Sequence, residues 1–100
     1  MKELLEAVNK LMLEEYNRAA EKFGPKNNGP HESYAVIKEE VEEAAEELGT
    51  VNSQLEYYWF CVRENKINEQ NGKLKMIENF ALNAAAECIQ VAAMAFKARK

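Results

Sequence analysis

The chain has 100 residues, 47% of them hydrophobic and 30% charged, which suits one domain over residues 1–100 with a modest core. Seventeen acidic residues against 13 basic ones give a net charge of −4, and this charge disfavours binding to the phosphate backbone of nucleic acids. No apolar segment is long enough to cross a bilayer, and charges interrupt the first residues, where a signal peptide needs an unbroken apolar run. The sequence therefore favours a cytoplasmic protein that contacts neither a membrane nor nucleic acid.

The two cysteines, Cys61 and Cys88, lie inside apolar helical patterns without C-x-x-C spacing. Buried free thiols in a reducing compartment are the simplest account of them, and a disulfide between them stays open.

The first half of the chain predicts two helices. Residues 2–23 carry apolar side chains at helical spacing, and Gly24 and Pro25 then end the helix. Residues 24–30 form a loop, and a second helix runs from about Pro30 to Leu48. The apolar positions of the first helix are Leu5, Val8, Met12, Tyr16, Ala19 and Phe23.

The second half predicts two more helices. Gly49, Thr50, Asn52 and Ser53 form a break, followed by a short helix that carries Leu55, Tyr58, Trp59 and Val62. Residues 68–72, N-E-Q-N-G, read as a loop, and the last helix runs from about Lys73 to Ala98. The predicted fold is all-α, an antiparallel bundle of about four helices.

Apolar and acidic side chains occupy separate stripes on the second helix. At 100° per residue, the apolar stripe predicts the core face and holds Tyr34, Ile37, Val41, Ala44 and Leu48. A second stripe a quarter-turn away holds Glu40, Glu43 and Glu47, while Glu39, Glu42 and Glu46 lie further toward solvent. Like charges at this spacing repel by roughly 0.2–0.5 kcal/mol per pair. A metal ion, a basic side chain or simple solvation of an acidic face would each relieve the repulsion.

The consecutive aromatic residues Tyr58, Trp59 and Phe60 cannot all face the same way on one helix. Some of them either enlarge the core or meet a second subunit or a ligand. A chain of this length can also need a partner subunit to bury enough apolar surface. We therefore expect a homo-oligomer.

The last helix repeats the arrangement of an apolar stripe with a polar edge. The residues on that edge are Asn83, Glu87, Gln90, Met94 and, less tightly, Lys97. If this helix packs antiparallel beside the acidic helix, Glu40 and Glu43 face Glu87 and Gln90. Carboxylate and amide oxygens of this kind suit Mg²⁺ or Mn²⁺.

Two blocks of the sequence carry a family resemblance. H-E-S-Y-A-V-I-K-E-E-V-E-E-A-A-E-E-L at residues 31–48, followed by A-E-C-I-Q-V-A-A-M-A-F-K at residues 86–97, resembles the MazG-like all-α nucleotide pyrophosphohydrolases, especially their short phage and prophage members. That family pairs E-x-x-E on one helix with E-x-x-D on a later one. Glu40 and Glu43 match the first motif and Glu87 starts the second, but Gln90 stands where Asp is expected. The gap between the motifs is also longer than usual.

The resemblance implies Mg²⁺-dependent cleavage of a nucleoside triphosphate into a monophosphate and pyrophosphate. Its metal ligands would be Glu40, Glu43 and Glu87, with Gln90 as a weaker ligand or an orienting group, and the change from Asp to Gln should lower metal affinity. Two acids, Glu39 and Glu43, are the candidates to accept the proton of the attacking water. Two further residues on the edge of the last helix, Asn83 and Lys97, would contact the base, sugar or phosphate. A dimer or a tetramer is expected.

Other chemistries fit less well. A di-iron bundle needs Glu-x-x-His on two helices, and the only histidine, His31, begins the acidic helix. No phosphate-binding glycine-rich loop or zinc pattern is present. The alternative to the enzyme is a non-catalytic helical interaction module, such as a phage accessory protein with a MazG-like fold.

Overall fold

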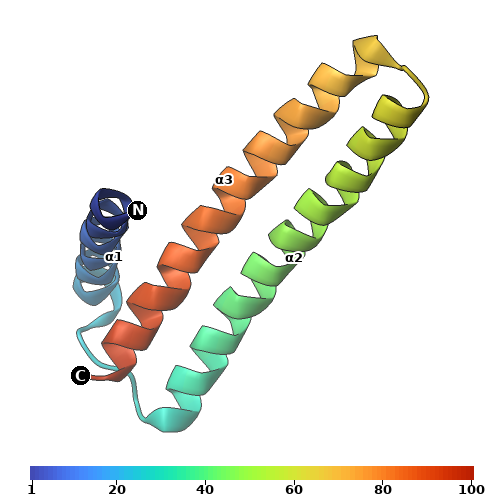
Figure 1. Ribbon diagram of the computed structural model, residues 1–100. Coiled ribbons are helices and arrows are strands. Elements are labelled where there is room, and N and C mark those ends of the chain that lie inside the picture. Colours follow the sequence, from blue (N-terminus) through green and yellow to red (C-terminus); the bar gives the residue numbers. More distant parts are fainter. The chain divides into compact units, whose positions relative to one another are not determined.

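The computed structural model describes all residues from Met1 to Lys100, and it contains three helices and no strand (Figure 1). The helices are α1 (Lys2–Phe23), α2 (Pro30–Arg63) and α3 (Ile67–Ala98). The all-α prediction is confirmed, but the prediction of four helices is wrong. No helix has both the length and the hydrophobicity needed to cross a lipid bilayer.

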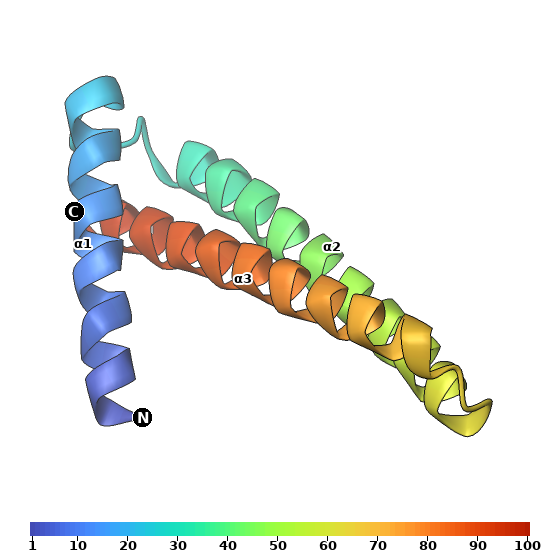
Figure 2. The same cartoon turned by 90° about the horizontal axis from the view of Figure 1, so that it is seen from above.

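The chain divides into two compact units, one made of residues 1–42 and 86–100 and the other of residues 43–85. The first unit contains α1, the beginning of α2 and the end of α3. The second unit is an antiparallel hairpin of the remaining parts of α2 and α3 (Figures 1 and 2).

Helix α1 has the predicted bounds. Its C-terminal residue Phe23 is followed by Gly24, whose φ of 89° lies in the region that favours glycine. The Gly24 N–H donates to the carbonyl oxygen of Ala20, and Pro25 prevents a further helical turn. Glycine and proline therefore end the helix where the sequence places them.

Helix α2 continues through the predicted break at residues 49–53 and extends for 34 residues. The hydroxyl of Thr50 donates to the Glu46 carbonyl, and the hydroxyl of Ser53 donates to the Gly49 carbonyl. These side chains bond back to the preceding turn of the helix instead of capping a new one. A single interior glycine costs only about 1 kcal/mol relative to alanine, which helix packing can offset.

Helix α2 ends at Arg63 with a Schellman motif. Asn65 has a φ of 52°, the Lys66 N–H donates to the Cys61 carbonyl, and the Asn65 N–H donates to the Val62 carbonyl. Asparagine tolerates this left-handed conformation better than most residues. The turn between the long helices therefore lies at residues 64–66.

The predicted loop at residues 68–72 is wrong, because these residues form the first turns of α3. Four of them are exposed, so their polarity is compatible with a helix surface. The fifth, Gln70, donates from its side-chain nitrogen to the Cys61 carbonyl at 3.4 Å and so binds the start of α3 to the end of α2.

The core is small and built mainly from small side chains. The buried apolar residues are Ala44, Cys61, Ala84, Ala93 and Met94. The short side chain of alanine lets neighbouring helices approach closely. The cysteines are both free; Cys61 is buried as predicted, whereas Cys88 is exposed, which corrects its predicted burial.

The predicted core face of α2 is only partly right. Ala44 is buried and Ile37 is half-buried, but Tyr34, Val41 and Leu48 are exposed. Helix periodicity fixes which residues share a face but not which face meets a partner. In α2 the half-buried face also includes Glu40 and Glu47, which lie on the predicted acidic stripe.

Candidate functional site

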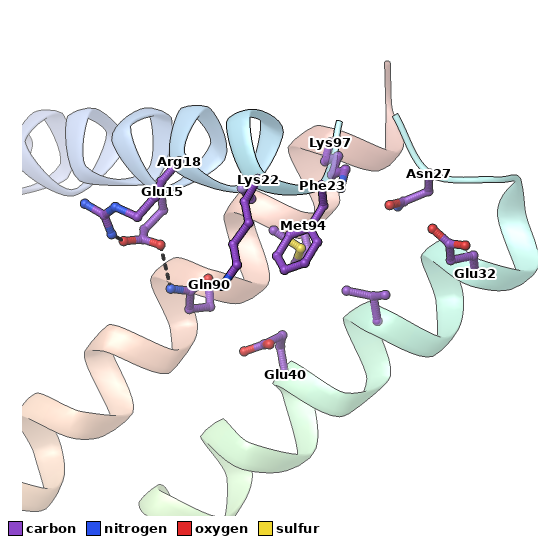
Figure 3. Close-up of a pocket in the computed structure, with 12 residues that line it drawn as sticks. Glu15, Arg18, Lys22, Phe23, Asn27, Glu32, Glu40, Gln90, Met94 and Lys97 are labelled. Atoms are coloured by element: carbon purple, nitrogen blue, oxygen red, sulfur yellow. Dashed lines mark hydrogen bonds and ion pairs between the residues drawn. The ribbon is translucent and has the colours of Figure 1, made fainter. Parts of the chain in front are cut away.

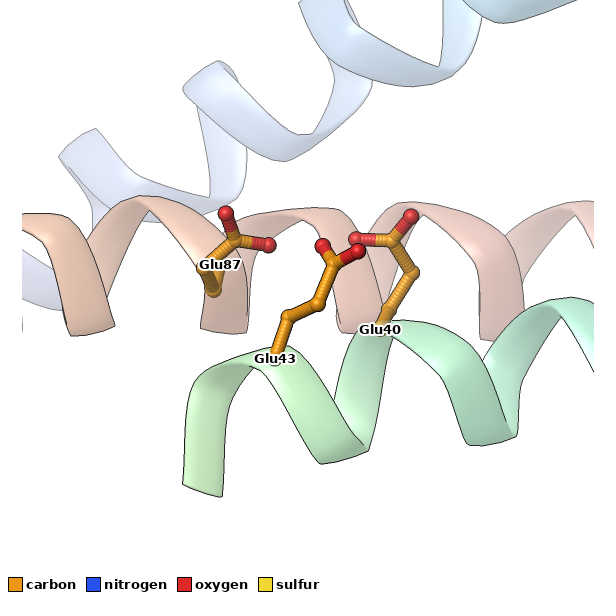
Figure 4. Close-up of side chains that lie close together, drawn as sticks. All are labelled: Glu40, Glu43 and Glu87. Atoms are coloured by element: carbon orange, nitrogen blue, oxygen red, sulfur yellow. The ribbon is translucent and has the colours of Figure 1, made fainter. Parts of the chain in front are cut away.

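Three carboxylates gather where the sequence predicts that they meet. Glu40 and Glu43 lie one turn apart on α2, and Glu87 projects from α3 (Figure 4). One carboxylate oxygen from each lies within 4.8 Å of the other two. Glu40 and Glu87 are half-buried in the first unit, while Glu43 is exposed and is the first residue of the second.

This spacing is close to what one divalent cation requires. Ligand oxygens lie about 2.0–2.1 Å from Mg²⁺ and about 2.3–2.6 Å from Ca²⁺, so two oxygens on opposite sides of one ion are about 4–5 Å apart. The observed limit of 4.8 Å allows coordination after a rotamer adjustment. An all-oxygen set of this charge favours hard ions such as Mg²⁺ and Mn²⁺. Glu40, Glu43 and Glu87 are thus able to hold a metal.

A pocket of ≈ 460 Å³ lies in the first unit, and Glu40 contributes to its wall (Figure 3). We call it the main pocket. All three helices and the connection between α1 and α2 provide its lining. The lining residues are Glu15, Arg18, Ala19, Lys22, Phe23, Asn27, Glu32, Val36, Glu40, Gln90, Met94 and Lys97.

The main pocket combines three cationic side chains with an apolar wall. Arg18 and Lys22 come from α1, and Lys97 comes from α3. Arg18 is exposed and pairs with Glu15, whereas Lys97 is only 6% exposed. Three carboxylates, of Glu15, Glu32 and Glu40, line the same pocket. Pockets of this size bind small organic ligands, and cations together with carboxylates suit an anionic ligand that carries a divalent cation.

Gln90 has a defined orientation in this pocket. Its side-chain nitrogen donates to the Glu15 carboxylate at 2.8 Å (Figure 3). A carboxylate can only accept hydrogen bonds from an amide, so the NH₂ group of Gln90 must face Glu15. The carbonyl oxygen of Gln90 is consequently fixed on the other side of the amide, where it can accept a hydrogen bond or bind a cation.

Exchanging the amide of Gln90 and the carboxylate of Glu15 tests whether their hydrogen bond stabilises the fold. We expect Gln90→Glu to lower the free energy of unfolding by about 1–3 kcal/mol without divalent metal, because two carboxylates then face each other. Adding Glu15→Gln should restore most of the loss. Urea denaturation in EDTA measures both variants; a double variant as unstable as the single one would contradict the hydrogen bond.

The other predicted site residues fall in different places. Lys97 lines the main pocket, but Asn83 is exposed and lies outside the described pockets. Glu39 is likewise exposed and outside the carboxylate cluster. The catalytic role of Glu39 and the substrate contact of Asn83 stay predictions.

Sequence reasoning missed the contribution of α1. Glu15, Arg18 and Lys22 follow one another at spacings of three and four residues, so they share a polar edge of that helix. That pattern was available in the sequence, but only the packing of α1 against α3 brings it to Gln90.

No protein-family model, curated protein or solved structure matches this chain. The chemistry of the site therefore rests on its own residues.

Proposed function

We propose that the protein is an Mg²⁺-dependent nucleoside triphosphate pyrophosphohydrolase of MazG-like type. The observation that supports this most is the cluster of Glu40, Glu43 and Glu87, one of whose members also lines a cation-bearing pocket. A triphosphate needs both a divalent cation and positively charged side chains, because it carries several negative charges. The substrate is an NTP or dNTP, and the products are a monophosphate and pyrophosphate.

In this proposal, Glu40, Glu43 and Glu87 hold the ion, and the fixed carbonyl oxygen of Gln90 is a further neutral donor. Mg²⁺ bound there supplies charge neutralisation and Lewis acidity to the scissile phosphoryl group. Because Gln90 replaces the family's Asp, the site has one negative charge fewer. We expect weaker metal affinity than a fourth acid would give.

The remaining residues bind and orient the substrate. Arg18, Lys22 and Lys97 can each donate to phosphate oxygens. The apolar wall, which includes Val36 and Met94, can contact the base or sugar. Glu43 is exposed, so water reaches its carboxylate and it can accept the proton of the attacking water.

We further propose that the protein is a homo-oligomer. At 11.4 kDa its accessible surface is 7449 Å², whereas a monomer of this mass typically exposes about 5,800 Å². Large apolar side chains recur every seven residues on α2 and are about half exposed or more: Tyr34, Val41, Leu48 and Leu55. A seven-residue apolar repeat is typical of helices that pack against another helix.

Helix α3 also carries exposed apolar side chains at this spacing. Ile67 and Leu74 are exposed and also seven residues apart. At residues 58–60, Tyr58 is half-buried, while Trp59 and Phe60 are exposed, as expected for aromatics that face different ways. A second copy of the chain is the partner we propose for these apolar side chains. An exposed free thiol at Cys88 suits a reducing compartment such as the cytoplasm.

The activity can be tested with a panel of ribo- and deoxyribonucleoside triphosphates in Mg²⁺ or Mn²⁺, with pyrophosphate release as the readout. The native chain should turn over at least one member of the panel. Gln90→Asp should lower the Mg²⁺ concentration needed for half-maximal rate, because it adds a negative charge to the site. No release by either protein on any member would contradict the proposal and favour the interaction module.

A further inference from the structure

A second pocket of the first unit lies where the connection between α1 and α2 meets the end of α3. Its volume is ≈ 200 Å³. It is lined by Lys26, Asn27, Gly29, Pro30, Ser33, Lys97, Ala98 and Lys100. Three lysines and no acidic residue line this lysine pocket, although the chain as a whole has a net charge of −4. The pocket is therefore positively charged, although the protein as a whole is negatively charged.

Lys97 is the residue that distinguishes this pocket from a group of surface lysines. It is the one buried charged residue, 6% exposed, and no salt bridge includes it, although acidic residues line the main pocket to which it also belongs. Burial of a cation without an opposite charge is costly, so such a group normally has an anionic partner. The helix dipole accounts for basic residues at the end of α3 but not for the burial of this one.

Neutral donors complement the lysines. The pocket includes the beginning of α2, where the N–H groups of His31 and Glu32 have no acceptor within the helix and the dipole favours an anion. Pro30 has no N–H, and the Ser33 N–H donates to the Gly29 carbonyl. The Asn27 side-chain nitrogen donates to the Ser33 hydroxyl oxygen at 3.0 Å. The hydroxyl hydrogen of Ser33 therefore remains available to donate to a ligand.

Aromatic rings position the third lysine. The Lys100 nitrogen lies 4.3 Å from the centre of the Phe96 ring and 5.8 Å from that of Tyr16. These two rings pack edge to face, with centroids 4.9 Å apart. A lysine side chain held over ring faces has less conformational freedom than one in solvent, so it loses less conformational entropy when an anion binds.

We propose that the lysine pocket is a binding site for a phosphate-type oxyanion, inorganic phosphate or pyrophosphate, and that it needs no divalent metal. Its volume is less than half that of the main pocket, ≈ 200 Å³ against ≈ 460 Å³, which suits a free anion better than a nucleotide. The two pockets share Lys97 and Asn27 but otherwise have different linings. The inference does not depend on the proposed hydrolysis.

Two matched double variants test the assignment by calorimetric titration of the intact chain with phosphate and, separately, with pyrophosphate, both in EDTA. Lys26→Gln with Lys100→Gln changes the lysine pocket but not the main pocket, and Arg18→Gln with Lys22→Gln changes the main pocket but not the lysine pocket. Each removes two positive charges. We expect the first to weaken affinity at least about tenfold and the second to change it less than about twofold. The anion that binds the native chain with the higher affinity, phosphate or pyrophosphate, is identified as the ligand.

Amide chemical shifts provide the second readout. Phosphate or pyrophosphate should move the N–H signals of Gly29, His31 and Ser33 at the start of α2. No binding by the native chain would overturn the proposal. Equal weakening by both double variants would also overturn it, because it would indicate general charge attraction, and loss only in the Arg18 and Lys22 variant would place the anion in the main pocket. All titrations omit metal, so a failure of the hydrolysis proposal leaves their interpretation unchanged.

Discussion

Replacing Glu40 by Gln is expected to lower Mg²⁺-dependent pyrophosphate release by about two orders of magnitude or more. A bound metal contributes several kcal/mol of transition-state stabilisation, and each factor of ten in rate corresponds to about 1.4 kcal/mol. Glu40 is half-buried and belongs to both the carboxylate cluster and the main pocket. Its neutralisation should therefore affect metal binding and substrate placement together.

Thermal melts separate this effect from a loss of folding. The native chain should melt at a higher temperature in Mg²⁺ than in EDTA, because a ligand that binds only the folded state stabilises it. Glu40→Gln should abolish that increase, because the variant lacks one of the proposed metal ligands. Glu46→Gln is the matched control, because Glu46 is an exposed acid of α2 outside the cluster. An Mg²⁺ response in Glu40→Gln equal to that of the native chain would contradict the assigned ligand.

Replacing both Leu48 and Leu55 by Glu is expected to convert an oligomer into monomers. Each leucine is about half exposed, 54% and 52%, and lies on the seven-residue repeat of α2. Full burial of an exposed leucine side chain contributes about 1.5–3 kcal/mol, and about half of this remains to be gained at each half-exposed leucine, so the four leucines of a dimer account for a change in dissociation constant of about two orders of magnitude or more. Four buried carboxylates would add repulsion.

Light scattering after size-exclusion chromatography measures this change directly as molar mass. Tyr57→Glu is the control, because Tyr57 is an exposed apolar residue of α2 outside the repeat. The control should keep the native mass, whereas the double variant should have the mass of one chain. A native chain that is already monomeric at high micromolar concentration would contradict the proposed oligomer.

The bounds of α1 follow from local sequence, since Gly24 and Pro25 determine its end without help from other elements. Local sequence does not predict that α2 continues through residues 49–53. Gly49 with its polar neighbours has the composition of a turn, and only packing along both long helices favours one uninterrupted helix. The three-residue turn at 64–66 likewise depends on an asparagine in a left-handed conformation, which composition alone indicates weakly.

The candidate site also has features that the sequence predicts and features that only the structure reveals. Helix periodicity and antiparallel packing predict that Glu40, Glu43 and Glu87 lie close together, and their carboxylates are close in the structure. Their role as metal ligands stays a prediction. The hydrogen bond of Gln90 to Glu15 joins residues 75 positions apart, so no local pattern could indicate it. The burial of Lys97 is also invisible in the sequence, because basic residues near a helix end usually remain in solvent.

The most direct test of the proposed function is ³¹P NMR of the products formed from a nucleoside triphosphate by the native chain in Mg²⁺. Cleavage between the α and β phosphates predicts a nucleoside monophosphate and pyrophosphate in equal amounts, with no diphosphate at any time. A nucleoside diphosphate with inorganic phosphate, or an unchanged triphosphate for every base and sugar tested, would contradict the assignment of the carboxylate cluster to this reaction.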